Sequence, residues 1–292
     1  MKNQTIGEKV FNIFNIGIMI ILVIITLYPF LYVIFASLSN PDLLIAHSGL
    51  LFAPLGFNLL SYKAVLSYDA IWRSYGNTLF IVVVGVALNI VLTSFGAYAL
   101  SRRDFMWKKH VMLFIVFTMF FSGGLIPFFF TVKELGMYNT LWSVIIPGAI
   151  STFNLIILRS AFETLPVSLE ESAEIDGAGH FTILSRIIFP LSLPTVAVVA
   201  LYYAVGHWNA WFNASIFIAD RRLFPLQLVL REILLANDTS SMSGSFNADS
   251  QVQIGETIKY ALIIVSTLPI LIAYPYLQKY FVKGTMIGAV KE

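Results

Sequence analysis

Six intervals of this 292-residue sequence contain no charged residue and are each long enough to cross a lipid bilayer. A helix needs about 20 predominantly apolar residues to span the hydrocarbon core, where unpaired backbone groups are too costly for irregular structure. The intervals are 10–41, 74–101, 110–132, 135–158, 187–219 and 260–278. They predict an all-α integral membrane protein with six transmembrane helices.

The spans themselves are expected inside these intervals, in one transmembrane domain that covers residues 1–292. We place them at about 11–36, 77–100, 111–131, 140–158, 193–218 and 260–278. A seventh interval, 43–62, also lacks charge, but Pro54 and Gly56 interrupt it. This interval is expected to be an external loop that lies against the helices.

Composition agrees with a membrane protein and excludes several other classes. Hydrophobic residues make up 58% of the sequence and charged residues only 12%, unlike a soluble domain. The net charge of +2 is too small to indicate a nucleic-acid partner. Because the chain has no cysteine, it has neither disulfides nor thiolate metal sites.

Lysine and arginine indicate the orientation in the cell membrane. The densest basic group is Arg102, Arg103, Lys108 and Lys109, between the second and third spans. Since short cytoplasmic loops carry an excess of such residues, we expect a multi-pass protein with both termini in the cytoplasm. The first apolar run is longer than a cleaved signal peptide and is expected to remain as an anchor.

The densest acidic stretch follows the fourth span. Glu170, Glu171, Glu174 and Asp176 lie close together in a chain that has only 16 acidic residues. At about 100° per residue, the three glutamates share one face of a short helix and are expected to face a partner or water. A loop that is merely solvated by its charges is the alternative explanation.

Local chemistry predicts a short helix, a turn and a second helix in this stretch. Pro166 ends the preceding segment, and Ser168 and Glu171 have the spacing of a capping box. Gly177 is suited to a left-handed stop after the first helix. In the alternative explanation, Glu171 is occupied in capping.

The stretch Glu171-Ser-Ala-x-x-Asp176-Gly177-Ala178, followed by Pro190 and Pro194, resembles the signature loop of permease subunits in binding-protein-dependent ABC importers. Ser172 stands where the family usually has alanine, another small residue. The resemblance implies a cytoplasmic coupling loop over about 163–194, between spans four and five. The residues that it implies for coupling to the ATPase are Glu170, Glu171, Ala173, Asp176, Gly177, Ala178, Pro190 and Pro194.

Three further strings narrow the resemblance to carbohydrate importers of the maltose-permease-like superfamily. They are Phe120–Pro127, Tyr138–Trp142 and Gly206–Asn209, and they resemble the branch that handles complex oligosaccharides, such as alginate- or aldouronate-type permeases. The resemblance implies a second homologous permease, two ATPase subunits and an extracytoplasmic sugar-binding protein. ATP and magnesium then belong to the ATPase subunits, and this chain carries no cofactor.

Two groups inside the membrane are candidates for a sugar pathway. Indole rings stack on sugar C–H faces and amides bind hydroxyls, and paired glycines interrupt a span where a cavity receives the freed backbone groups. The candidates are His207, Trp208, Asn209, Trp211, Asn213, Gly123 and Gly124. The alternatives are a polar cluster that joins helices or subunits and a simple packing kink. In the maltose importers, the resolved sugar site belongs mainly to the partner permease.

Two further segments are expected to contact partners. The resemblance places the substrate-binding protein against the external loop 219–258, which is otherwise a solvated connector. The basic tail 278–292 resembles tails that approach the interface between the ATPase subunits, although positive-inside anchoring explains its lysines equally well.

Enzyme functions find no support in the sequence. The chain lacks the Gly-x-x-x-x-Gly-Lys-Ser/Thr loop that binds nucleotide, and its four histidines are far apart. The predicted function is therefore half of a translocation pathway for ATP-driven import of oligosaccharides or polysaccharide fragments. The alternatives are a permease for a non-sugar solute and a membrane scaffold or sensor that contacts an ATPase without transport.

Overall fold

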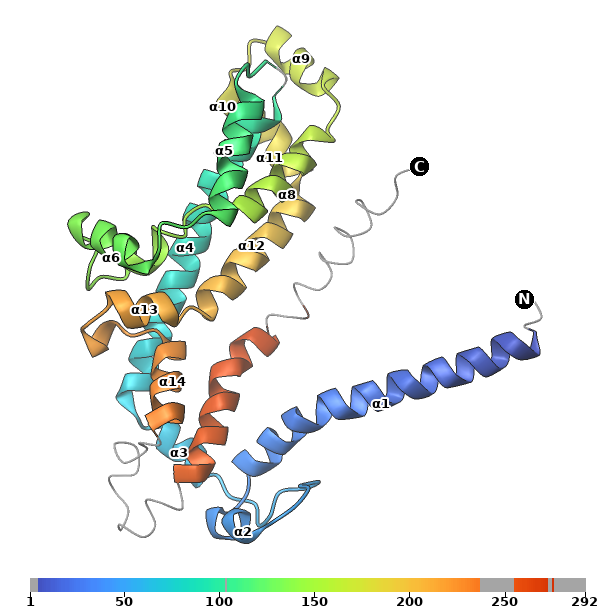
Figure 1. Ribbon diagram of the computed structural model, residues 1–292, viewed down its shortest axis with the longest axis vertical. Helices are drawn as coiled ribbons and strands as arrows, with labels where there is room; N and C mark the ends of the chain where they lie inside the picture. The colour runs from blue at the N-terminus through green and yellow to red at the C-terminus, as the bar shows by residue number, and fades with distance from the viewer. Residues whose placement is uncertain (1–4, 103, 237–254, 273–274, 276–292) are drawn as a thin grey trace. The chain divides into compact units, whose positions relative to one another are not determined.

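The computed structural model describes residues 5–102, 104–236, 255–272 and 275, which form helices and connecting loops without any strand (Figure 1). The chain divides into two compact units. The first unit comprises residues 1–69 and 232–268, and the second comprises 70–231 and 269–292. The external-loop segment 237–254 and the tail beyond 275 lie outside the described residues, so the partner predictions for them stay predictions.

The first unit is built on helix α1 (Ile6–Ser37), which begins with a reciprocal capping box between Thr5 and Glu8. The short helices α2 (Pro41–Ala46) and α3 (Leu60–Leu66) follow it. The interval 43–62 therefore contains no span. It packs against the unit, since Leu51 is buried and its N–H donates to the Tyr28 hydroxyl at 2.9 Å.

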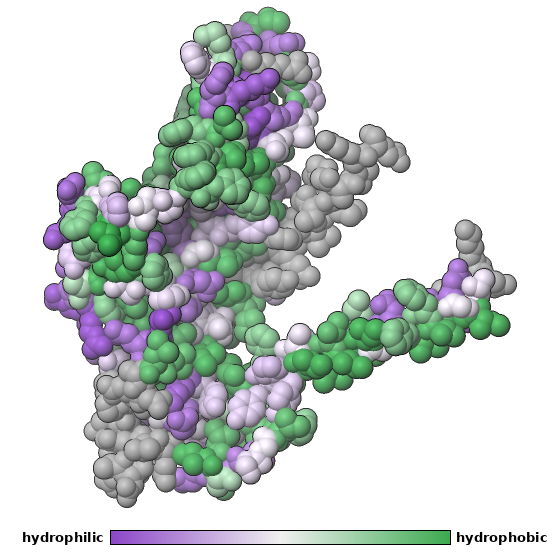
Figure 2. All heavy atoms as spheres, viewed as in Figure 1, coloured by the Kyte–Doolittle hydropathy of each residue, from purple (hydrophilic) through white to green (hydrophobic). Residues whose placement is uncertain are grey.

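Three described helices are long and apolar enough to cross a membrane. They are α1, α4 (Asp69–Ser101) and the helix Gly255–Ile272. Hydrophobic side chains cover most of α1 and are exposed (Figure 2), as lipid contact requires. Two bent helix pairs raise the number of candidate spans to five.

The second unit packs helices α4, α8 (Thr152–Glu163) and α12 (Leu193–Trp208) around one core. The core also receives Ala173 from α9 (Ser168–Ile175) and Ile183 from α10 (His180–Ile183). Its largest fully buried side chains include Leu158, Phe162, Ile183 and Ile188. Small residues allow close approach, because a Cβ at Gly96 would lie 3.1 Å from Leu155.

The predicted third span is interrupted where the sequence suggested. Helix α5 (Lys108–Phe120) ends before the glycine pair, and α6 (Leu125–Glu134) leaves at an angle of 114°. Gly124 has a φ of +86°, which favours glycine. At 1.5 Å per residue, α5 is about 20 Å long and therefore shorter than the hydrocarbon core.

The expected helix over 140–158 is not continuous, because α7 (Trp142–Ile145) ends before Pro147 and α8 begins at Thr152. Asn89 on α4 stabilises the irregular segment between these helices. Its side-chain amide donates to the carbonyls of Gly148 and Ala149 at 3.0 and 2.7 Å. This pairing satisfies the backbone groups that the break leaves free.

The expected helix over 193–218 is also divided. Helix α12 ends at Trp208 and the short α13 (Phe212–Phe217) follows after a break. Asn139, with a φ of 58°, links the end of α13 to the turn before α7, since its side-chain oxygen accepts from the N–H groups of Ala219 and Asp220. Beyond it, α14 (Leu226–Ala236) begins with the Leu226 N–H bonded to the Thr78 hydroxyl.

Candidate functional site

The acidic stretch forms helix α9 (Ser168–Ile175), a tight turn and helix α10 (His180–Ile183). Gly177 follows α9 with a φ of +80°. Its N–H donates to the backbone carbonyl of Glu174 at 2.9 Å, and the Ala178 N–H donates to the backbone carbonyl of Ala173 at 2.8 Å. These two bonds make a Schellman motif, and the predicted left-handed stop at Gly177 is confirmed.

The predicted capping box at the start of α9 is wrong. Val167 already has helical backbone angles, and no side chain caps the helix. Ser168 lies inside the first turn, and the Glu171 N–H donates to the Val167 carbonyl at 3.1 Å. The Glu171 carboxylate is thus not occupied in capping, and within the described residues it makes no hydrogen bond.

Glu170 does not share the exposed face that the helical spacing predicted. It forms an ion pair with Arg102 at the end of α4, and the two side chains are only 12% and 19% exposed. Arg102 also lies over the Tyr98 ring at 4.8 Å. Burial lowers the pKa of Arg102, and the nearby Tyr98 and Glu163 partly offset that effect. Glu170 therefore attaches α9 to the helical core.

The remaining surface of α9 is open to solvent. Glu171, Glu174 and Asp176 are exposed. Beside them, Ile175 is 86% exposed and Phe181 is 68% exposed. Hydrophilic residues gather at the end of the second unit that carries α9 and α10 (Figure 2). This surface combines carboxylates with protruding apolar side chains.

The small residues of the stretch pack against the helical core, and its prolines lie in helical segments. Ala173 is buried in the core and Ala178 packs against the same cluster. A π-helical turn (Leu184–Ile188) and α11 (Phe189–Leu191), which contains Pro190, continue the chain after α10. Pro194 then lies in the first turn of α12, at a bend of 86°. Proline at the first turn of a helix loses no hydrogen bond.

A second charged cluster joins α5 to α8 near the acidic stretch. Glu163 accepts from Lys108 at 2.6 Å and from Arg159 at 2.9 Å. Burial raises the pKa of Glu163, but the hydrogen bonds from the two cations outweigh it and leave the pKa below its usual value. The carboxylate is therefore charged at neutral pH.

His207 takes part in a buried polar cluster that joins α4 to α12. Its Nε2 lies 2.7 Å from the Asn89 side-chain oxygen. Because the Asn89 amide nitrogen already donates to two carbonyls, its oxygen must accept, and the His207 Nε2 carries the proton. A neighbouring bond joins Thr93 to the Tyr203 hydroxyl at 2.8 Å. This arrangement supports the alternative that His207 joins helices.

We expect Gly85→Ala to destabilise the fold by about 1–3 kcal/mol, the usual cost of overpacking. A Cβ at this position would lie 2.6 Å from His207 Nε2 and would displace the ring from Asn89. Gly76→Ala is the matched control on the same helix, because nothing lies within 4 Å of its Cβ. Thermal unfolding of the purified variants measures the effect, and equal midpoints for both would contradict this packing role.

The other aromatic and amide candidates separate into different environments. Trp208 is buried against Tyr75 with ring centroids 6.2 Å apart, and its indole N–H has no hydrogen-bond partner among the described residues. The Arg231 guanidinium lies over the Trp211 ring, 3.5 Å from the ring centroid, in a cation–π contact. Asn209 is exposed and donates to the Val205 carbonyl at 3.0 Å. These residues do not form one cluster with His207.

Asn213 instead lies with the glycine pair. A groove of about 510 Å³ is lined by Gly123 and Gly124 from the break between α5 and α6, and by Phe212 and Asn213 from α13. Two candidate groups that are far apart in the sequence thus meet at one surface. An amide and exposed backbone in a groove of this size can bind a small polar ligand.

Sequence reasoning missed several residues of these sites. Asn89, Arg102, Glu163 and Arg159 fix the geometry through contacts between distant segments. An asparagine in the middle of an apolar span, such as Asn89, is itself a signal, because such a residue needs partners inside the bundle. For Glu163 at the end of α8 and Glu170 in the first turn of α9, the sequence contains no local signal that predicts which cation each residue binds.

Comparison with known proteins identifies the family. Residues 106–287 match the family described as "Binding-protein-dependent transport system inner membrane component". The polygalacturonan/rhamnogalacturonan transport system permease protein YtcP of Bacillus subtilis (strain 168) is 39% identical over the whole of both chains. Protein LplC of the same organism is 42% identical, with all of this chain and 98% of the relative covered.

A solved structure agrees with this assignment. A chain in the crystal structure of a bacterial ABC transporter involved in the import of the acidic polysaccharide alginate has a TM-score of 0.90 and 31% identity, over 96% of this chain and 100% of that chain. The present chain therefore belongs to the family of binding-protein-dependent transport system inner membrane components. It is a membrane-embedded transporter subunit rather than an enzyme, as the sequence predicted.

Proposed function

We propose that this chain forms half of the translocation pathway of an ATP-driven importer of oligosaccharides or polysaccharide fragments. A second homologous permease completes the pathway, two ATPase subunits supply energy with ATP and magnesium, and an extracytoplasmic protein delivers the sugar. The relatives named for polygalacturonan/rhamnogalacturonan transport and alginate import support this substrate class. Polygalacturonan and alginate are both acidic polysaccharides, and this shared property favours acidic fragments as the substrate.

In this proposal, six crossings are formed by α1, α4, the α5–α6 pair, α7 with α8, α12 with α13, and the helix from Gly255. Non-helical backbone is tolerated at membrane depth where protein or a water-filled cavity receives it. The breaks therefore belong to the pathway and the bundle interior. Both termini and the coupling loop over 163–194 lie on the cytoplasmic side.

The observation that carries the coupling role is the surface of α9. The Schellman turn at Gly177 and the Glu170–Arg102 ion pair attach α9 firmly to the core, while Glu171 and Ile175 protrude. A rigid connection of this kind transmits movement of a bound ATPase to α4 and α12. Rocking of the spans would then open the pathway alternately to the cytoplasmic side and to the external side of the membrane.

Reconstitution of the purified complex in vesicles tests the function. The proposal predicts uptake and ATP hydrolysis that are both stimulated by acidic oligosaccharides delivered by the binding protein, with weaker responses to neutral maltodextrins. Stimulation by a non-sugar solute would support the alternative permease. ATPase association without uptake of any solute would support the scaffold.

Asn213→Ala should raise the sugar concentration for half-maximal uptake about fivefold, the factor that corresponds to ~1 kcal/mol for one lost hydrogen bond. Asn213 lines the groove beside Gly123 and Gly124. Ser215→Ala is the control on the same helix, because Ser215 is exposed and, within the described residues, its hydroxyl donates only to the Phe212 carbonyl of its own helix. Identical uptake curves for the two variants would remove Asn213 from the pathway.

A further inference from the structure

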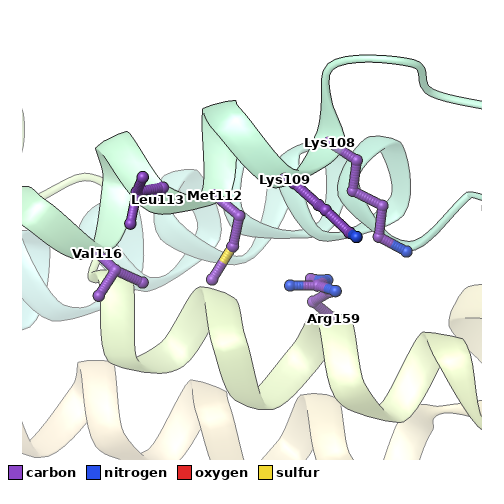
Figure 3. A pocket seen from close by; sticks show the side chains of 6 residues that line it. All are labelled: Lys108, Lys109, Met112, Leu113, Val116 and Arg159. Carbon is purple, nitrogen blue, oxygen red and sulfur yellow. The ribbon is translucent and has the colours of Figure 1, made fainter.

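A groove with a basic end and an apolar wall lies between α5 and α8. It shares one lining residue, Lys108, with the cavity that Glu170, Glu171 and Glu174 line. Its volume is about 570 Å³, within the usual range for small-molecule sites. Figure 3 shows Lys109 and Arg159 directed toward the gap between the two helices. The lining residues are Lys108, Lys109, Met112, Leu113, Val116 and Arg159.

The basic end has more positive than negative charge. Glu163 is the carboxylate that pairs with Lys108 and Arg159, so that one negative charge is shared by two cations. Lys109 is exposed and makes no ion pair within the described residues. Two net positive charges therefore remain for an anionic ligand. Arg159 donates to Glu163 from Nε and Nη2, so its Nη1 group is the donor that it offers to a phosphate.

The apolar wall continues from the charged end along one face of α5. Lys109, Met112, Leu113 and Val116 lie on neighbouring turns, and Lys109 is about 10 Å from Val116 at 1.5 Å per residue. Leu113 is 70% exposed, as expected for a side chain that contacts lipid. The groove is therefore amphipathic along its length.

Aromatic side chains indicate the depth of the basic end. Trp107 immediately precedes α5, is 59% exposed and lies against the His110 ring at 5.6 Å. Exposed tryptophans of this kind concentrate at the level of lipid headgroups. In the orientation of the proposed function, this level belongs to the cytoplasmic leaflet, where anionic lipids accumulate.

We propose that the groove between α5 and α8 binds an anionic phospholipid of the cytoplasmic leaflet. Lys109 and Arg159 hold the phosphate, and Met112, Leu113 and Val116 contact the first part of the acyl chains. A free phosphate would use only the basic end and would leave the apolar wall without a partner. The bound lipid bridges α5 and α8, whose ends also carry the Lys108–Glu163 ion pair.

Native mass spectrometry of the complete complex tests this site with added phosphatidylglycerol or phosphatidylcholine. The wild-type complex should retain phosphatidylglycerol preferentially, and Lys109→Gln should weaken that retention about fivefold, the factor for ~1 kcal/mol per cation near an anionic surface. Retention of phosphatidylcholine should not change. Lys9→Gln is the matched control, because Lys9 is exposed near the predicted cytoplasmic end of α1.

The readout is independent of uptake, so failure of the transport function and failure of the lipid site are distinguishable. Equal retention of both lipids, or an equal effect of Lys9→Gln and Lys109→Gln, would overturn the site. Displacement of the lipid by inorganic phosphate alone would assign the groove to a soluble anion instead. Loss of the second permease in Lys109→Gln, with unchanged lipid in the remaining complex, would assign this face to a subunit contact.

Discussion

Gly177→Val should abolish uptake while the chain still inserts and reaches normal abundance. Gly177 has a φ of +80°, and a Cβ there meets nothing within 4 Å, so the effect comes from the backbone rather than from a clash. A side chain in left-handed conformation costs about 1–2 kcal/mol, and a β-branched one costs more. The turn would relax to another geometry, and α9 would lose its position relative to α10.

Gly179→Val is the matched control for this prediction. Gly179 lies two residues further on, has an ordinary φ of −79°, and also has nothing within 4 Å of its Cβ. We expect the control to transport at nearly the wild-type rate. Equal loss of uptake in both variants would show that bulk in this turn, rather than the left-handed conformation, is responsible.

Glu171→Lys should detach the ATPase from an otherwise intact membrane complex. A carboxylate that meets a basic groove gains a charge-assisted hydrogen bond worth about 1–3 kcal/mol, whereas a lysine adds repulsion. Because the structure removes the capping role of Glu171, Glu171→Gln should also weaken attachment, but less than Glu171→Lys. Co-purification of the ATPase with each variant measures the effect.

Glu134→Lys provides the same change of charge at an exposed position of α6, far along the chain from the acidic stretch. The Glu134→Lys complex should retain the ATPase, which would show that the change of charge alone, at any exposed position, does not detach the ATPase. Full retention by Glu171→Lys would exclude Glu171 from docking. Comparable losses in the two lysine variants would point to misassembly of the complex.

Local signals in the sequence predicted the features that depend on neighbouring residues. Runs of apolar residues indicated helices at membrane depth, and Gly177 indicated the turn after α9. The glycine pair at 123–124 indicated the break between α5 and α6. In each case the residue type alone restricts the backbone.

The failures have two physical causes. The sequence pattern places the cap at Ser168, but the helix already has its cap position at Val167, so the predicted cap lies one residue too late. The other failures concern contacts between distant segments, such as His207 with Asn89, 118 positions apart. Periodicity carries no information on such pairs, and therefore it predicts Glu170 on the exposed face rather than in an ion pair with Arg102.

The breaks within 140–158 and 193–218 illustrate the same limit. A charge-free interval is compatible with either a continuous helix or a broken one, because both remain apolar. Pro147 and Gly148 were local signs of a break. Asn89 from another helix makes that break stable, and only the fold brings it there.

Photocrosslinking from α9 tests most directly whether this surface carries the ATPase. Because the chain has no cysteine, Ile175→Cys provides one thiol, at a position that is 86% exposed, for a thiol-reactive photocrosslinker. Leu135→Cys, at a 67% exposed position after α6, is the control. The account predicts a crosslink from Ile175→Cys to the ATPase subunit and none from Leu135→Cys. No crosslink from Ile175→Cys in a complex that hydrolyses ATP and imports sugar would contradict it.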